Sequence, residues 1–140
     1  MLLVVACSGD DDGATTTSSS RPSTTVVEAV DAADGLDDPY YPELGGGSID
    51  VQHYALALTV SADGRRIDGT ATLTILPTPP LASISLDLLG LEVASARVDG
   101  VDAEVERDGR QLRVVPAEPL LEREPVEVVV TYGGEPEPVP

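Results

Sequence analysis

Large apolar residues alternate with polar ones along most of the chain after Ile49. Within residues 51–60 the alternation is regular: one face carries Tyr54, Leu56, Leu58 and Val60, and the other carries His53, Ala55, Ala57 and Thr59. This two-residue period is typical of a β-strand. A second alternating stretch covers residues 67–75, and the pair Asp63-Gly64 between the two stretches favours a turn. The pattern predicts an antiparallel hairpin.

Five further alternating stretches follow, at residues 84–88, 91–98, 101–106, 112–114 and 126–131. They are separated by prolines or by Asp-Gly pairs, both of which end strands and form turns. No stretch with helical periodicity competes with them. Seven short strands with breaks of this kind predict an all-β fold, an antiparallel β-sandwich.

The chain before the strands has a different composition. Residues 8–38 are rich in Ser, Thr and Asp and poor in large apolar side chains, a composition that indicates a disordered acidic linker. We therefore expect residues 39–140 to hold the β domain, in partial form. The formal net charge is −17 and all eight basic residues are Arg, so a nucleic-acid partner is not expected.

Cys7 is the only cysteine, so an intramolecular disulfide is excluded. The residues up to it read V-V-A-C, which resembles the lipobox of a bacterial lipoprotein, and residues 1–7 are similar to a truncated lipoprotein signal. The resemblance implies lipidation of Cys7 and an extracytoplasmic protein that is lipid-anchored to the bacterial cell membrane. The basic residues that normally begin a signal are absent, so an incidental cysteine stays the alternative.

The chemistry open to this chain alone is narrow. A zinc peptidase needs three protein ligands, usually including two histidines, and His53 is the only histidine. Asp50 and His53 lie three residues apart on a predicted strand, so they are expected on opposite faces and unable to share a catalytic triad. We therefore predict no catalytic residue, no metal ligand and no cofactor in this chain, with His53 a structural residue on the outer face.

The predicted hairpin also carries a family resemblance. Asp50, His53, Tyr54, Leu56 and Leu58, then Gly69, Ala71, Leu73 and Ile75, resemble the first hairpin of the aminopeptidase N-like zinc metallopeptidases, the gluzincin aminopeptidases. A second block, L-D-L-x-G-L-x-V at residues 86–93, and V-D-G at residues 98–100 follow in the family's order. The lead-in at residues 38–45 is similar to that of secreted bacterial members of lipoprotein type.

The resemblance implies a function outside these 140 residues. It identifies the chain as the non-catalytic N-terminal portion, a saddle-like β domain, of a membrane-anchored zinc aminopeptidase that releases N-terminal residues from peptides. Zinc, the catalytic domain in cis and the peptide substrate would then belong to the full-length enzyme. The domain would be incomplete, with the strand at residues 126–130 left as an exposed edge.

A second hypothesis, a binding protein instead of part of an enzyme, stays open. The same acidic linker and strands suit a freestanding extracellular lipoprotein with an immunoglobulin-like binding module.

Overall fold

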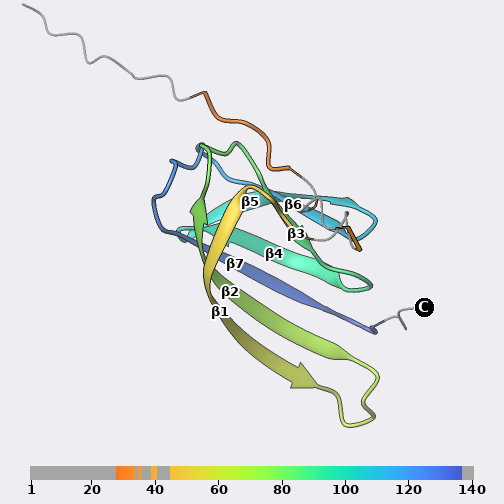
Figure 1. Ribbon diagram of the computed structural model, residues 1–140. Coiled ribbons are helices and arrows are strands. Elements are labelled where there is room, and N and C mark those ends of the chain that lie inside the picture. The colour runs from red at the N-terminus through yellow and green to blue at the C-terminus, as the bar shows by residue number, and fades with distance from the viewer. Residues whose placement is uncertain (1–27, 34, 36–38, 41–44, 137–140) are drawn as a thin grey trace, which may run out of the picture.

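The computed structural model describes residues 28–33, 35, 39–40 and 45–136, and these contain seven β-strands (Figure 1). The strands are β1 (Ile49–Val60), β2 (Ile67–Pro77), β3 (Ile84–Asp87), β4 (Glu92–Val98), β5 (Val101–Asp108), β6 (Gln111–Val115) and β7 (Val126–Gly134). Each coincides with one predicted stretch, because alternating Val, Leu and Ile fit a surface buried on one face. The predicted all-β fold and its seven strands are confirmed.

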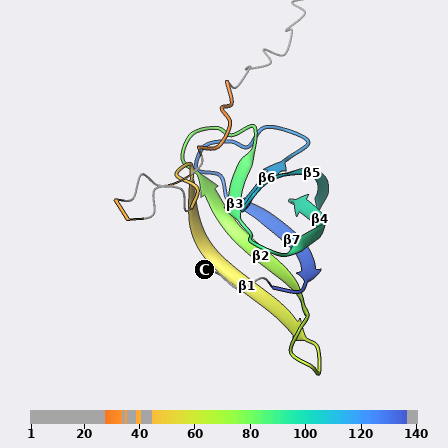
Figure 2. The ribbon, with the colours of Figure 1, turned by 90° about the vertical axis from the view of Figure 1, so that its right-hand side faces the viewer.

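All strand pairs are antiparallel, and the sheet order is β1-β2-β7-β4-β5-β6-β3. The last strand, β7, thus lies in the interior of the sheet between β2 and β4 (Figure 2). The prediction that residues 126–130 form an exposed edge is therefore wrong. Alternation shows which face of a strand is buried, but it does not show which strands are its neighbours.

The sheet curls into a half-barrel, so the two layers of the predicted sandwich are two ends of one continuous sheet (Figure 2). Its concave face holds the core. The buried apolar side chains are Leu73, Ile75, Leu81, Ile84, Ala96, Val98, Leu112, Val114, Leu120, Val126, Val128 and Val130. These twelve residues are all aliphatic, and Tyr132 packs against them from the partly buried margin of the core.

A β-bulge divides β1 into two parts. The register places Val51 opposite Ile75 but His53 opposite Thr74, so Gln52 is the extra residue. Asp50 lies opposite Leu76, which is on the same face as Thr74. The bulge therefore brings Asp50 and His53 to the same face, and the prediction that they lie on opposite faces is wrong. A period-two pattern cannot reveal a single inserted residue.

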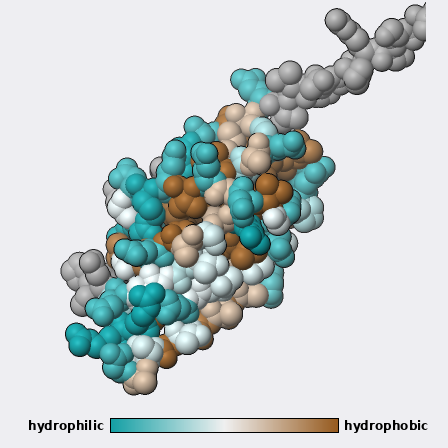
Figure 3. Space-filling model, turned by 180° about the vertical axis from the view of Figure 1, so that it is seen from behind, coloured by the Kyte–Doolittle hydropathy of each residue, from teal (hydrophilic) through white to brown (hydrophobic). Residues whose placement is uncertain are grey.

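Two turns show how local chemistry connects the strands. Asp99 and Gly100 both have positive φ, 49° and 79°, as a two-residue hairpin turn between β4 and β5 requires. Asp99 also joins this turn to β7, because its Oδ1 accepts a hydrogen bond from the Glu127 amide at 2.9 Å. The turn from β1 to β2 is charged: Arg66 donates to Asp68 at 2.6 Å. Seen from behind, hydrophilic surface gathers at this end of the molecule (Figure 3).

The core predicts a sharp contrast between two Leu→Ala substitutions. Leu112 is 1% exposed, so Leu112→Ala removes buried methyl groups and leaves a cavity, and we expect a loss of about 2–5 kcal/mol in the free energy of unfolding. Leu89 is 45% exposed, so Leu89→Ala should change it by about 0.5 kcal/mol or less. Urea denaturation measures both, and equal losses would contradict this description of the core.

Candidate functional site

The segment at residues 28–33, named the strap here, lies against the β domain. Val30 forms a parallel bridge with Leu81, accepting a hydrogen bond from the Ala82 amide at 2.8 Å and donating to Pro80 at 3.0 Å. Ala32 packs against the hydrophobic core. The predicted disordered linker, residues 8–38, included this segment. In the structure the strap makes specific contacts with the β domain. The remainder of the predicted linker, except Gly35, lies outside the described residues.

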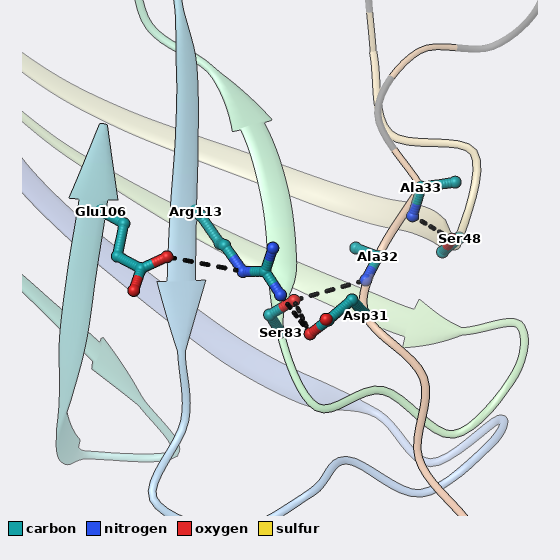
Figure 4. A network of polar contacts seen from close by, with 7 residues as sticks. All are labelled: Asp31, Ala32, Ala33, Ser48, Ser83, Glu106 and Arg113. Carbon is teal, nitrogen blue, oxygen red and sulfur yellow. Dashed lines mark hydrogen bonds and ion pairs between the residues drawn. The ribbon is translucent and has the colours of Figure 1, made fainter. Parts of the chain in front are cut away.

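A polar network fixes the strap (Figure 4). Asp31 accepts a hydrogen bond from the Ser83 hydroxyl at 3.1 Å and forms an ion pair with Arg113 of β6. The Ala32 amide donates to Ser83 Oγ at 3.3 Å, and the Ala33 amide donates to Ser48 Oγ at 2.9 Å. Strap backbone donors thus find partners on two segments of the domain, and the Asp31 carboxylate finds one on a third, β6.

The network also sets the ionisation of Asp31. The hydrogen bond from Arg113, and then that from Ser83, lowers the pKa of the Asp31 carboxyl below its ordinary value of 3.8. Arg113 lies near a second carboxylate, since its Nε is 3.8 Å from Glu106 Oε2 on the neighbouring strand β5. The arginine is therefore shared between the strap and the sheet.

A groove of about 380 Å³ opens on the concave face of the half-barrel. Side chains from strands far apart in the sheet line it, chiefly Val51, Tyr54, Leu73, Leu86, Leu112 and Tyr132. They come from β1, β2, β3, β6 and β7, so the groove exists because the sheet curls its two ends toward each other. Its lining suits an apolar side chain.

The rim of the groove carries one organised carboxylate. Asp87 at the end of β3 accepts a hydrogen bond from the Gly45 amide at 2.6 Å and one from Gln111 Nε2 at 3.0 Å. Ser85 in turn donates to Gln111 Oε1 at 2.9 Å. Gly46 lies so close that a Cβ there would be 2.7 Å from the Ser85 carbonyl oxygen. The segment before β1 can therefore pack on β3 only with glycine at this position.

The concave face continues beyond the groove as a row of exposed apolar side chains on β1, named the apolar stripe here. It comprises Tyr54, Leu56, Leu58 and Val60, which are 55%, 60%, 56% and 58% exposed. Leu58 and Tyr132 lie on either side of Gly69, whose missing side chain gives them room. The alternation correctly predicted that these four side chains share one face of the hairpin. They extend beyond the buried core, however, and remain more than half exposed.

The residues singled out in the sequence do not assemble into a reactive centre. His53 is exposed on the outer face, away from the groove, and Cys7 lies outside the described residues. Within the described residues there is no group of three or more His, Cys, Asp or Glu side chains placed to hold a metal ion. The part of the chain that the structure describes also contains no helix long and apolar enough to cross a membrane.

The residues that organise the strap and the rim are ones that sequence reasoning missed. Arg113 and Ser83 carried one usable signal, because each is a polar residue among Val, Leu and Ile in a predicted strand or next to one. Arg107 was missed in the same way; it donates to the carbonyls of Leu88 at 2.8 Å and Leu91 at 2.9 Å and so fixes the connection from β3 to β4. Their partners are distant in sequence, so no local pattern could identify them.

The strap predicts a local effect of Asp31→Asn. Loss of the carboxylate removes the ion pair to Arg113, so the amides of Ala32 and Ala33 should exchange their hydrogens roughly two- to fivefold faster, the size expected for an exposed pair. Hydrogen exchange followed by NMR measures this. Asp102→Asn, which removes the exposed pair to Arg97, is the matched control and should leave both amides unchanged.

The lowered pKa of Asp31 predicts how the strap responds to acid. A carboxyl with a depressed folded-state pKa stabilises the folded arrangement above its unfolded value and loses that contribution as the pH falls through the folded value. The strap should therefore be attached at neutral pH and loosen below about 3.8, the ordinary value. The amide chemical shift of Ala32 should report this transition in the native chain. If Asp31→Asn titrated identically, Asp31 would not be the group responsible.

Comparisons with known proteins show which solved structures the β domain resembles. No protein-family model matches the chain, and no curated protein sequence matches it. Among solved structures, the M1 zinc metallopeptidase from Deinococcus radiodurans matches with a TM-score of 0.70 and 32% sequence identity, over 76% of this chain and 25% of that one. A two-domain M1 zinc metallopeptidase bound to L-arginine matches with a TM-score of 0.69 and 33% identity, over 76% and 25%.

A more distant match supports the fold alone. The yeast LTA4 hydrolase has a TM-score of 0.53 at 20% identity, over 82% of this chain and 17% of that one. The chain spans about a quarter of the length of the first metallopeptidases it matches, and the matched part is their N-terminal portion. The resemblance expected from the hairpin residues is confirmed at this level: the chain has the fold of the N-terminal β domain of M1 zinc metallopeptidases.

Proposed function

We propose that this β domain is the non-catalytic N-terminal part of a zinc aminopeptidase. The observation that carries the proposal is the match to M1 zinc metallopeptidases at 31–33% identity with TM-scores near 0.70. One of these structures is described as bound to a Tyr-Ser-Ala substrate and another as bound to L-arginine, which are a short peptide and a free amino acid. Release of single residues from peptides would account for both ligands, and the resemblance of the hairpin to aminopeptidase N-like enzymes favours release from the N-terminus.

The domain's own chemistry fits a supporting part in that activity. The groove is apolar, and its one organised carboxylate, Asp87, already accepts two hydrogen bonds from the protein. His53 lies on the outer face, so it is not available to a reaction in the groove. In the proposed enzyme, zinc and the residues that bind it belong to a catalytic domain in cis, and the β domain stands beside that domain.

We also propose that the enzyme is held at the outside of the bacterial membrane through Cys7. The lipobox-like sequence before it supports lipidation, and the Ser-, Thr- and Asp-rich stretch after it supports a spacer. Because the strap is attached to the domain from Val30, the spacer would end before Val30 rather than at residue 38. The β domain would then stand closer to the membrane than a fully flexible linker allows.

The aminopeptidase proposal predicts where activity is found. An antibody against the β domain should precipitate from the source organism a polypeptide that hydrolyses aminoacyl-arylamides, loses the activity with a chelator and regains it with zinc. The 140-residue chain alone should show neither activity nor stoichiometric zinc. Precipitation of only a 14.5 kDa inactive protein would favour the alternative of a freestanding binding module.

The anchoring proposal predicts a change of location. When the protein is expressed in the source organism, Cys7→Ala should move it from the membrane fraction to the soluble fraction, because the acyl chains that hold it there cannot be attached. Mass spectrometry of the wild-type N-terminus should show acylation. Ser8→Ala is the matched control, and equal distribution of the two variants would contradict an anchor at Cys7.

A further inference from the structure

The two ends of the sheet are protected to very different degrees. At one end, β3 has only four residues, and the segment before β1 packs against it through Gly46 and through the hydrogen bond from Gly45 to Asp87. At the other end, β1 has twelve residues, and among the described residues none pairs with its outer edge. A long free edge offers a row of backbone donors and acceptors to another strand.

The free edge of β1 lacks the features that usually prevent strand pairing. Residues 54–60 read Y-A-L-A-L-T-V, with no charge, no proline and no glycine. The bulge at Gln52 lies before this stretch, and from His53 to Val60 the register with β2 is unbroken. The apolar stripe lies along the same residues, so in the part of the chain that the structure describes this edge offers unpaired backbone together with apolar side chains that are more than half exposed.

We propose that this edge binds a second copy of the same chain, with β1 pairing antiparallel to β1 around a two-fold axis at Ala57. In this register Tyr54 lies opposite Val60 of the second copy, and Leu56 lies opposite Leu58. All four residues of the apolar stripe thus pair with one another, on one face of a sheet that runs through both copies. On the other face Ala55 lies opposite Thr59, and Ala57 lies opposite itself.

Charge does not oppose this partner along the free edge of β1. The chain has a formal net charge of −17, so two copies repel each other over most of their surfaces. Residues 53–60 contain no Asp or Glu; along the chain the nearest charged residues are Asp50 and Asp63, and Asp68 lies opposite Thr59 on the neighbouring strand β2. Added salt should therefore strengthen the dimer, because it screens the general repulsion and weakens no ion pair at the seam.

The size of the contact sets its strength. Seven paired residues form an interface at or below the small end of specific protein interfaces, about 1,200 Å² of total buried surface. We expect a dimer that forms at micromolar concentrations and dissociates on dilution. The inference rests on the described β domain and uses no part of the proposed function.

A cysteine pair tests the register directly. In a Cys7→Ser background, Ala57→Cys should form a disulfide-linked dimer on mild oxidation, because directly opposite residues have Cα atoms about 4.5–5.5 Å apart. Ala55→Cys and Thr59→Cys should not cross-link alone, yet an equal mixture of the two should form a mixed disulfide. A dimer linked through Ala55→Cys alone would overturn the two-fold axis at Ala57.

A matched pair of charged variants tests the surface. Leu58→Lys places two ammonium groups at the seam of each dimer and should weaken dimerisation at least about tenfold in sedimentation equilibrium. Val101→Lys makes the same kind of change at another residue that is 56% exposed, as Leu58 is, and should leave the dimer unchanged. Thermal melts of both variants check folding.

The result that overturns the proposal is a native chain that stays monomeric up to about 0.5 mM, well above the concentrations expected for so small an interface. Equal weakening by Leu58→Lys and Val101→Lys would overturn it as well, since association would then not run through β1. After either result, the free edge of β1 would be expected to pair with a strand of different sequence, such as one from the proposed catalytic domain.

Discussion

The pairing of β7 with both β2 and β4 holds the domain together. Through β7 the β1–β2 hairpin joins the strands β4, β5, β6 and β3, and no other strand in the described residues connects these two groups. Val126, Val128 and Val130 are almost fully buried on its concave face, so the pairing and the core form together. The turn at Asp99 reinforces the junction by its hydrogen bonds with Glu127. With β7 in this place, β1 and β3 are the two edge strands of the sheet.

The sequence was sufficient to predict where the strands lie along the chain, but it did not predict which strands pair with each other. Alternation gave all seven strands, since burial on one face imposes a period of two on each strand separately. It gave neither the place of β7 nor the bulge at Gln52, because both depend on how a strand meets another one. The network of Asp31, Ser83 and Arg113 was hidden for the same reason, as its members are far apart along the chain. The hairpin residues supplied the family resemblance, which strand periodicity alone could not.

The strap shows where a composition rule stops applying. Residues 28–33 read E-A-V-D-A-A, with Val30 as the one large apolar side chain, yet they attach because Val30 adds backbone hydrogen bonds beside Leu81 and Asp31 forms an ion pair with Arg113. Composition indicates how much apolar surface a segment can bury. The strap is attached instead by a few contacts, to Leu81 and Arg113, which the folded domain holds in place. The boundary between spacer and domain is therefore set by the domain's surface.

The central place of β7 has a consequence for synthesis on the ribosome. The strand that joins the two halves of the sheet is the last of the seven to be made, so β2 and β4 leave the exit tunnel before the strand that pairs with both of them does. Until residue 134 emerges, the nascent chain has two separate strand groups with four open edges in total, and its long-range contacts must wait. Slow codons or a chaperone would matter most between residues 77 and 126, after the first hairpin and before its partner strand.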